Sequence, residues 1–196
     1  ADLRLTGAGH DVEATSLAVG GDLVATGTGD VSITTTGGTD VDGSVDVQDG
    51  SLETAGAFTV DGDLGVSAGL LAAGPITVGG DVTAGTTVEL QLTANLGGDL
   101  TAGGDATVLG PLTLTGGGLQ TLDSGGTLRL AGTTGKAAGT LALDATTLVR
   151  VEDAITLGGS LLVGGPAELD LGGAAVSAGG AITFTEALTL ASDAVL

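Results

Sequence analysis

The sequence predicts an all-β protein: a parallel β-helix, or β-solenoid, of about ten coils of about 20 residues, with three short strands in each coil. Three observations predict this fold. A Gly-x-apolar motif returns at nearly constant spacing, short runs alternate between apolar and polar residues, and 39 glycines accompany a hydrophobic content of 42%. Disordered chains have a low hydrophobic content, so the glycines indicate frequent sharp turns in a folded chain.

The repeat is most visible at its apolar anchor, the residue that follows Gly-x in each copy. Successive anchors are 18 to 22 residues apart. A unit of this length has too little apolar surface to fold alone, so stacked copies must share one core. At about 4.8 Å per coil, the ten anchors predict a rod about 50 Å long. The predicted core anchors are Leu3, Leu23, Val45, Leu64, Val82, Leu100, Leu119, Leu141, Leu161 and Ile182.

A glycine stands two residues before every anchor except the first. An apolar residue commonly comes two positions earlier still, as in segments 19–23 and 78–82. We interpret these segments as the corner of each coil, with both apolar residues pointing inward. Gly tolerates the positive φ that a sharp corner needs, and Asp can bond to local backbone N–H groups. The predicted structural turn glycines are Gly21, Gly43, Gly62, Gly80, Gly98, Gly117, Gly139, Gly159 and Gly180.

The strands are predicted from short runs of alternating apolar and polar residues. Along the chain these runs include residues 3–5, 31–33, 88–92, 112–114, 128–130 and 169–171. A period of two is typical of strands with one buried face, and no segment keeps the 3.6-residue period of a helix. The interior is expected to be thin and aliphatic, with the only two aromatic residues, Phe58 and Phe184, stacked inside it. Pairs such as Thr113 and Thr115 are interpreted as ordinary outward strand residues.

The corner sequence resembles a known repeat. The likeness lies in coils of about 20 residues and in Gly20-Gly21-Asp22-Leu23, Gly79-Gly80-Asp81-Val82 and Gly97-Gly98-Asp99-Leu100. It resembles the filamentous haemagglutinin-type repeat of secreted bacterial adhesins and exoproteins, or a related surface filament, over nearly the whole chain. The resemblance implies an exported protein that forms right-handed β-helical stalks at the cell surface. Two departures are the scarcity of Asn, present only as Asn95, and the lack of a recognisable amino-terminal secretion domain.

The charge excludes several classes of partner. The formal net charge is −20, from 24 acidic residues and only four Lys and Arg. Phosphate binding needs Lys and Arg, so neither nucleic acid nor an anionic membrane is an expected partner. No apolar run approaches the roughly 20 residues of a membrane span, so membrane insertion is not expected. Cys is absent, which excludes disulfides and thiolate sites.

The residues that enzymes commonly use are scarce. His10 is the only histidine, and we interpret it as a surface turn residue rather than a catalyst. There is no Trp or Tyr to form a sugar platform, and no G-x-x-x-x-G-K-[ST] motif to bind phosphate, since Ala137 follows the single Lys136. We therefore expect no enzymatic activity and no cofactor.

A column of aspartates is the sharpest candidate site. Asp22, Asp63, Asp81 and Asp99 each stand directly before an anchor, as does Asp2. Stacked carboxylates about 5 Å apart repel by roughly 1 kcal/mol in water, so they face solvent or bind cations. We favour solvated turn aspartates. The alternative is a weak Ca²⁺ ladder, with these four residues as metal candidates, because Ca²⁺ prefers oxygen ligands.

The expected function is structural. Residues 1–196 are interpreted as a single β-solenoid repeat domain without obvious caps, whose open β-edges need more β-helix to cover them. We expect a rigid subunit or segment of an extracellular, cell-surface filament or adhesin stalk. Its expected partner is itself, as a homopolymer or a longer chain of the same repeats. The alternative is an adhesin-like binding module whose side face recognises a receptor or glycan.

Overall fold

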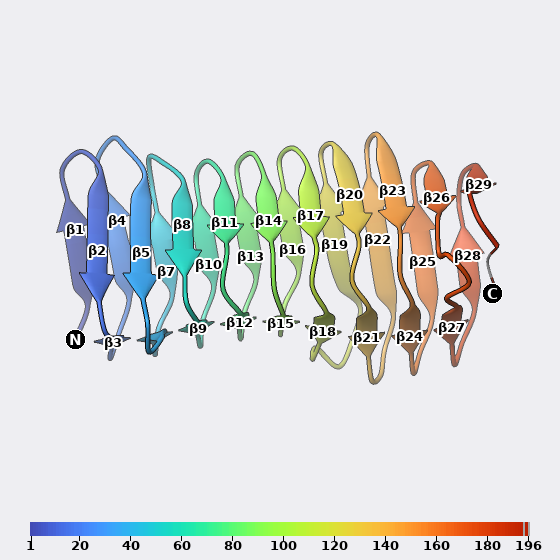
Figure 1. Cartoon of the computed structure of the whole chain (residues 1–196), viewed down its shortest axis with the longest axis horizontal. Helices are drawn as coiled ribbons and strands as arrows, with labels where there is room; N and C mark the ends of the chain where they lie inside the picture. Colours follow the sequence, from blue (N-terminus) through green and yellow to red (C-terminus); the bar gives the residue numbers. More distant parts are fainter. Residues whose placement is uncertain (194, 196) are drawn as a thin grey trace.

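The computed structural model describes residues 1–193 and 195, and in this part of the chain every regular element is a β-strand. The strands wind into a rod with one terminus at each end (Figure 1). Nine complete turns of three strands are followed by two strands of a tenth turn. The predicted parallel β-solenoid is therefore confirmed. Among the described residues no helix is long and apolar enough to cross a membrane.

Three parallel sheets form the three sides of the rod. Sheet 1 comprises β1 (Leu3–Thr6), β4 (Leu23–Thr26), β7 (Val45–Val47), β10 (Leu64–Val66), β13 (Val82–Ala84), β16 (Leu100–Ala102), β19 (Gln120–Ser124), β22 (Leu141–Ala145), β25 (Leu161–Gly164) and β28 (Ile182–Phe184). Sheet 2 comprises β2 (His10–Ala14), β5 (Val31–Thr35), β8 (Leu52–Ala55), β11 (Leu70–Ala72), β14 (Val88–Leu90), β17 (Ala106–Val108), β20 (Thr127–Leu130), β23 (Leu148–Val151), β26 (Ala167–Leu169) and β29 (Leu188–Leu190). Sheet 3 comprises β3 (Leu17–Val19), β6 (Thr39–Val41), β9 (Phe58–Val60), β12 (Ile76–Val78), β15 (Ala94–Leu96), β18 (Leu112–Leu114), β21 (Thr134–Lys136), β24 (Ile155–Leu157) and β27 (Val176–Ala178).

The core is a stack of aliphatic columns inside these sheets. Most strands have three residues, of which the first and third are buried and the middle one faces outward, as in β12 and β13. Because strands pair in register along the axis, like side chains stack on like, for example Leu64 on Val82. Phe58 is fully buried in this stack, and Phe184 is partly buried against it.

Nine of the ten predicted anchors lie in the interior. Seven are at most 2% exposed, whereas Leu3 and Ile182, in the outermost coils, are only partly buried against the core. The prediction that Leu119 is a core anchor was wrong. Its side chain is 67% exposed, and Leu100 pairs with Leu122 instead. The seven buried anchors are Leu23, Val45, Leu64, Val82, Leu100, Leu141 and Leu161.

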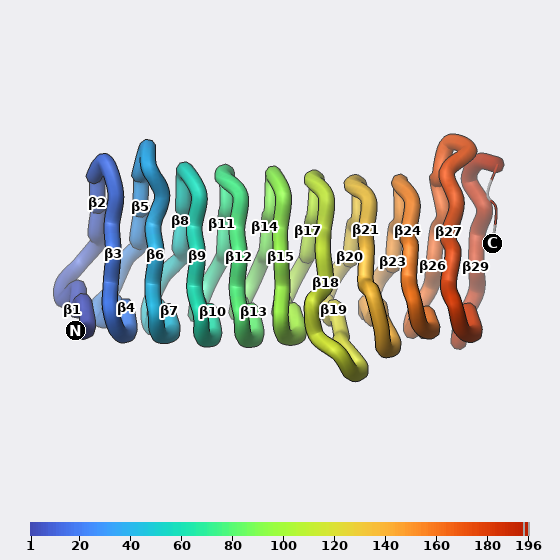
Figure 2. The backbone as a smooth tube through the Cα atoms, turned by 90° about the horizontal axis from the view of Figure 1, so that it is seen from below, coloured from blue at the N-terminus to red at the C-terminus, as the bar shows by residue number. Residues whose placement is uncertain are grey.

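The reason for this error is an insertion in one corner. The connection from β18 to β19 is longer than its counterparts and projects beyond the neighbouring corners (Figure 2). After the insertion, β19 begins two residues before the position that pairs with Leu100. Leu122 therefore pairs with Leu100, and Gln120 pairs with the anchor Leu141 of the next coil. A pattern of Gly-x-Leu alone cannot distinguish the exposed Leu119 from a buried residue.

The corner glycines are required for a reason that differs from the prediction. Of the nine predicted turn glycines only Gly139 has a positive φ, of 81°. Except for Gly117, the others stack closely on the preceding coil, and the N–H of Gly80, for example, donates to the carbonyl of Gly62 at 2.9 Å. A Cβ at Gly43 would lie 2.8 Å from the carbonyl carbon of Gly21, closer than real Cβ contacts. Glycine is therefore kept mainly because the coils approach too closely for a side chain.

Candidate functional site

The aspartate column forms a ladder of hydrogen bonds between coils. Oδ1 of Asp63 accepts the backbone N–H of Asp81 at 2.9 Å, and Oδ1 of Asp81 accepts that of Asp99 at 2.8 Å. Asp99 in turn accepts the N–H of Thr121 at 2.7 Å. The interpretation that the corner Asp bonds to local backbone N–H groups does not hold for these three residues, because each one accepts an N–H of the next coil. These bonds connect the coils along the axis.

The same ladder tolerates hydroxyl groups. Ser44 lies between Asp22 and Asp63 in the column: its N–H donates to Oδ1 of Asp22 at 2.9 Å, and its Oγ accepts the N–H of Asp63 at 3.1 Å. Because a hydroxyl replaces a carboxylate without breaking the ladder, the position requires an acceptor rather than a negative charge.

The carboxylates do not converge into a cage. Within residues 1–193 and 195, no group of three or more His, Asp or Glu side chains is arranged to hold a metal ion. The candidates Asp22, Asp63, Asp81 and Asp99 lie one above another, each with one oxygen engaged by a backbone N–H. Ca²⁺ takes six to eight oxygen ligands, so a linear column offers a poor fit.

We expect Ca²⁺ to stabilise the rod only by screening the repulsion among the stacked carboxylates. Millimolar CaCl₂ and NaCl of equal ionic strength should then raise the melting temperature equally. Calorimetric melts in the two salts would check this. A rise specific to Ca²⁺, lost when Asp81 is replaced by Asn, would instead establish the ladder as a calcium site.

A second polar cluster lies inside the solenoid and was not predicted from the sequence. Lys136, the only lysine, is 3% exposed and occupies an inward position of β21 between apolar neighbours. Its Nζ donates to the carbonyl of Gly116 and to Oε1 of Gln120, the latter at 3.0 Å. The side-chain amide of Gln120, itself 1% exposed, donates to the carbonyls of Leu96 (3.0 Å) and Gly98.

The side chains of this cluster donate hydrogen bonds to corner carbonyls that have lost their backbone donors because of the insertion. In the regular coils the carbonyl of each corner glycine accepts an N–H from the next coil, as Gly80 does from Gly98 at 3.0 Å. The insertion carries Gly117, a predicted turn glycine, away from this ladder, since a Cβ there would meet nothing within 4 Å. The side chains of Gln120 and Lys136 supply the missing donors, because unpaired buried carbonyls are costly.

Burial determines the electrostatics of Lys136. Desolvation lowers the pKa of its ammonium, and the carboxylate of Asp99 partly opposes this effect. Among the described residues no carboxylate lies within 4 Å of Nζ. The cation is therefore held by carbonyl dipoles rather than by an ion pair.

An ion-pair cluster connects three coils on the outer face of sheet 2. Arg129 forms a bidentate pair with Glu152, at 2.9 and 2.7 Å. Arg150 contacts Glu152 at 2.8 Å, Glu168 at 3.4 Å and Asp170 at 3.2 Å. The hydrogen bond from Arg129 lowers the pKa of Glu152. All three arginines thus have intramolecular ion-pair partners, since Arg4 lies 3.9 Å from Asp2.

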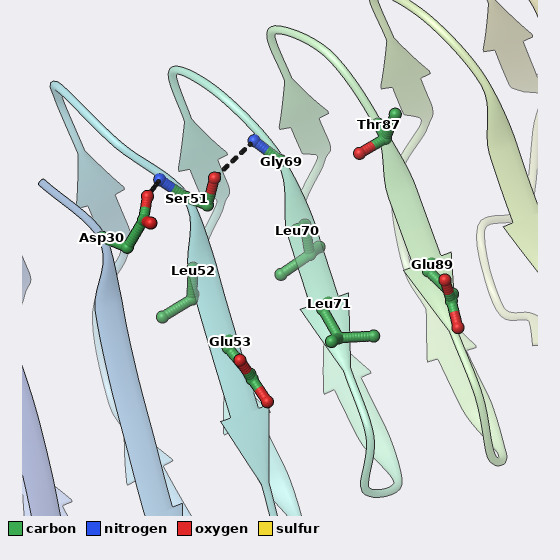
Figure 3. Close-up of a pocket in the computed structure, with 9 residues that line it drawn as sticks. All are labelled: Asp30, Ser51, Leu52, Glu53, Gly69, Leu70, Leu71, Thr87 and Glu89. Atoms are coloured by element: carbon green, nitrogen blue, oxygen red, sulfur yellow. Dashed lines mark hydrogen bonds between the residues drawn. The ribbon is translucent and has the colours of Figure 1, made fainter.

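A shallow groove on sheet 2 is the best candidate for ligand recognition (Figure 3). Its volume is about 320 Å³, at the lower end of ligand pockets. The side chains of Glu53, Leu71 and Glu89 occupy one outward column, with Leu71 between the two carboxylates. At the rim, Oγ of Ser51 accepts the N–H of Gly69 at 3.3 Å. Gly69 has no side chain in the corner column, which opens the groove.

His10 differs from its prediction. It begins β2 at an inward, half-buried position rather than standing in a corner, and it pairs with Val31 of the next coil. Its Nε2 is shielded from solvent and has no hydrogen-bond partner. In the register of β2 and β5, its neighbours Asp11 and Ser32 pair on the outer face, whereas His10 points inward.

Comparisons of the chain with protein-family models, curated proteins and solved structures gave no match. The parallel solenoid itself is established by the structure, through its three stacked sheets. The likeness to filamentous haemagglutinin-type repeats is supported by coil length and Gly-Gly-Asp corners alone.

Proposed function

We propose that this chain is a structural element: a rigid β-helical subunit or segment of an extracellular filament or adhesin stalk that stacks end to end through open β-edges. The observation that carries the proposal is the three parallel ladders that run continuously along the rod. Backbone hydrogen bonds of this kind lie along the axis, so bending or stretching the rod must strain many of them together. The Asp ladder adds side-chain bonds in the same direction.

The outermost coils support stacking on further β-helix. The inward side chains of Leu5 and Val12 near one end, and of Ile182 and Leu188 near the other, are only partly buried, whereas Leu64 in the middle is 0% exposed. Another copy, or further coils of the same repeat, would bury these side chains and pair the edge strands. Acidic side chains on sheets 1 and 2, such as Asp46 and Glu53, would keep rods soluble and apart along those faces.

Electron microscopy of the purified chain, with and without millimolar Ca²⁺, tests the proposal. We expect long thin fibres with a layer line near 4.8 Å, because stacked coils continue the interstrand spacing from one copy into the next. Fibres should form without Ca²⁺ and thicken only as ionic strength rises. Isolated short rods under all conditions would contradict self-stacking.

A second candidate function is recognition through a side face. The groove of Glu53, Leu71 and Glu89 favours it, because it combines an apolar floor with two carboxylates and a polar rim. Such a groove suits a cationic or hydroxyl-rich group on a receptor or glycan. This function would take precedence if electron microscopy gave only isolated rods.

A further inference from the structure

One face of the rod is uncharged over most of its length, although the chain carries a net charge of −20. From β9 to β27, seven successive strands of sheet 3 present only small uncharged residues at their outward middle positions. In order along the axis these residues are Thr59, Thr77, Asn95, Thr113, Gly135, Thr156 and Ser177.

The other two faces are charged at the equivalent positions. Sheet 1 presents Asp46 and Asp144, and sheet 2 presents Glu53, Glu89 and the ion-pair cluster around Arg150. Two rods that meet through sheets 1 or 2 therefore bring like charges together, which costs free energy. A basic partner would also be attracted to those faces rather than to sheet 3. The occupant that best matches the uncharged face is the same face of a second copy.

The outward column of sheet 3 has one protruding residue and one notch, so the faces of two copies can fit each other. Asn95 is its largest side chain, whereas Gly135 has none. Two hollows, of about 660 and 270 Å³, both include Gly135 together with Thr113 and Thr156. A Cβ at Gly135 would meet nothing within 4 Å, and its φ is not positive. Nothing within the chain therefore requires glycine at this notch.

Thr113 lies at the middle of the seven positions, with Asn95 one coil before it and Gly135 one coil after it. If two rods pack antiparallel through these faces about a two-fold axis at Thr113, Asn95 of each rod lies opposite the Gly135 notch of the other. Thr77 then lies opposite Thr156. A parallel pair would instead place Asn95 against Asn95 and leave both notches empty.

The acids in the corners that flank this face agree with the antiparallel arrangement. Asp61 follows β9 directly, and Asp153 stands two residues before β24. The same two-fold axis places Asp61 opposite Gly179, and Asp153 opposite Gly74. Neither of these two acids meets another acid across the interface. Asp40 of β6, next to Thr59 in the outward column, lies beyond Ser177 of the other copy.

We propose that the outward face of sheet 3 is an isologous interface through which two copies of this chain pair side by side and antiparallel. This pairing is independent of end-to-end stacking, which uses the edge strands. Seven coils span only about 30 Å, so the interface is smaller than a standard one and the isolated dimer should be weak. In a filament many such contacts would act together.

A charge substitution at the two-fold axis tests the interface. The Thr113→Asp variant places two carboxylates against each other, so its dimer dissociation constant should increase at least tenfold. Thr101→Asp is the matched control, because Thr101 has the same outward middle position in β16 of sheet 1. Its dissociation constant should stay within about twofold of the native value. Sedimentation velocity over a concentration series measures both. A native chain that stays monomeric to about 1 mM, or equal effects of the two substitutions, overturns the proposal.

Cysteine pairs test the orientation, since the chain has no natural Cys. With a short bismaleimide crosslinker, Thr113→Cys and the double variant Thr77→Cys/Thr156→Cys should give covalent dimers, whereas Thr77→Cys alone and Thr101→Cys should not. Crosslinking of Thr77→Cys alone would show parallel pairing and overturn the antiparallel arrangement. End-to-end stacking cannot produce these crosslinks, so failure of lateral pairing and failure of stacking are separate results.

Discussion

Replacing Gly80 with alanine is expected to destabilise the solenoid by about 3 kcal/mol. The added Cβ would lie 2.9 Å from the carbonyl carbon of Gly62 and would collide with the carboxylate of Asp63. The corner can relieve this overlap only by separating two coils, which weakens the Gly80–Gly62 bond and the bond from Asp81 to Asp63. A lower midpoint of guanidinium denaturation would measure the loss.

Gly117→Ala is the control for this substitution. Gly117 is also a glycine with no positive φ, but its Cβ would meet nothing within 4 Å. The change in stability should therefore stay within about 0.5 kcal/mol. Equal losses in Gly80→Ala and Gly117→Ala would mean that backbone flexibility, rather than close approach of the coils, explains the corner glycines.

Replacing Gln120 with leucine is expected to cost about 3–5 kcal/mol at neutral pH. The substitution removes one of the two acceptors of the Lys136 ammonium and the side-chain donor to the carbonyl of Gly98. A buried cation then keeps only the carbonyl of Gly116. The double variant Gln120→Leu/Lys136→Met should be more stable than Gln120→Leu alone, because it removes the poorly solvated charge. A double variant less stable than both single variants would contradict this account.

The pH dependence of stability gives an independent measure of the same group. Burial lowers the pKa of Lys136 below its usual value of 10.5. Between the folded and unfolded pKa values the unfolded chain binds more protons, so stability should rise with pH and level off above about 10.5. The chain has one Lys and neither Cys nor Tyr, and its arginines stay charged, so no other side chain titrates there. Denaturation series in this alkaline range should show the rise in the native chain and a flat profile in Lys136→Met.

The candidate site could be predicted from sequence only in part. The aspartate column is visible because its residues recur at the coil spacing, but the partner of each carboxylate is one coil away and has no mark in the local sequence. The groove at Leu71 depends on which corner residues lie side by side, such as Ser51 and Gly69. The outward column of sheet 3 is also invisible along the chain, because its members are separated by whole coils that contain other threonines.

The sequence by itself determined the architecture, because the spacing of the anchors and the period of two leave few alternatives to stacked three-strand coils. Regular coils such as those at Leu64, Val82 and Leu100 could be aligned correctly, since each repeats the one before it. Only the tertiary structure decided what happens where the repeat changes length. There the burial of Gln120 and Lys136, and not of Leu119, follows from the need to pair the corner carbonyls inside a narrow core.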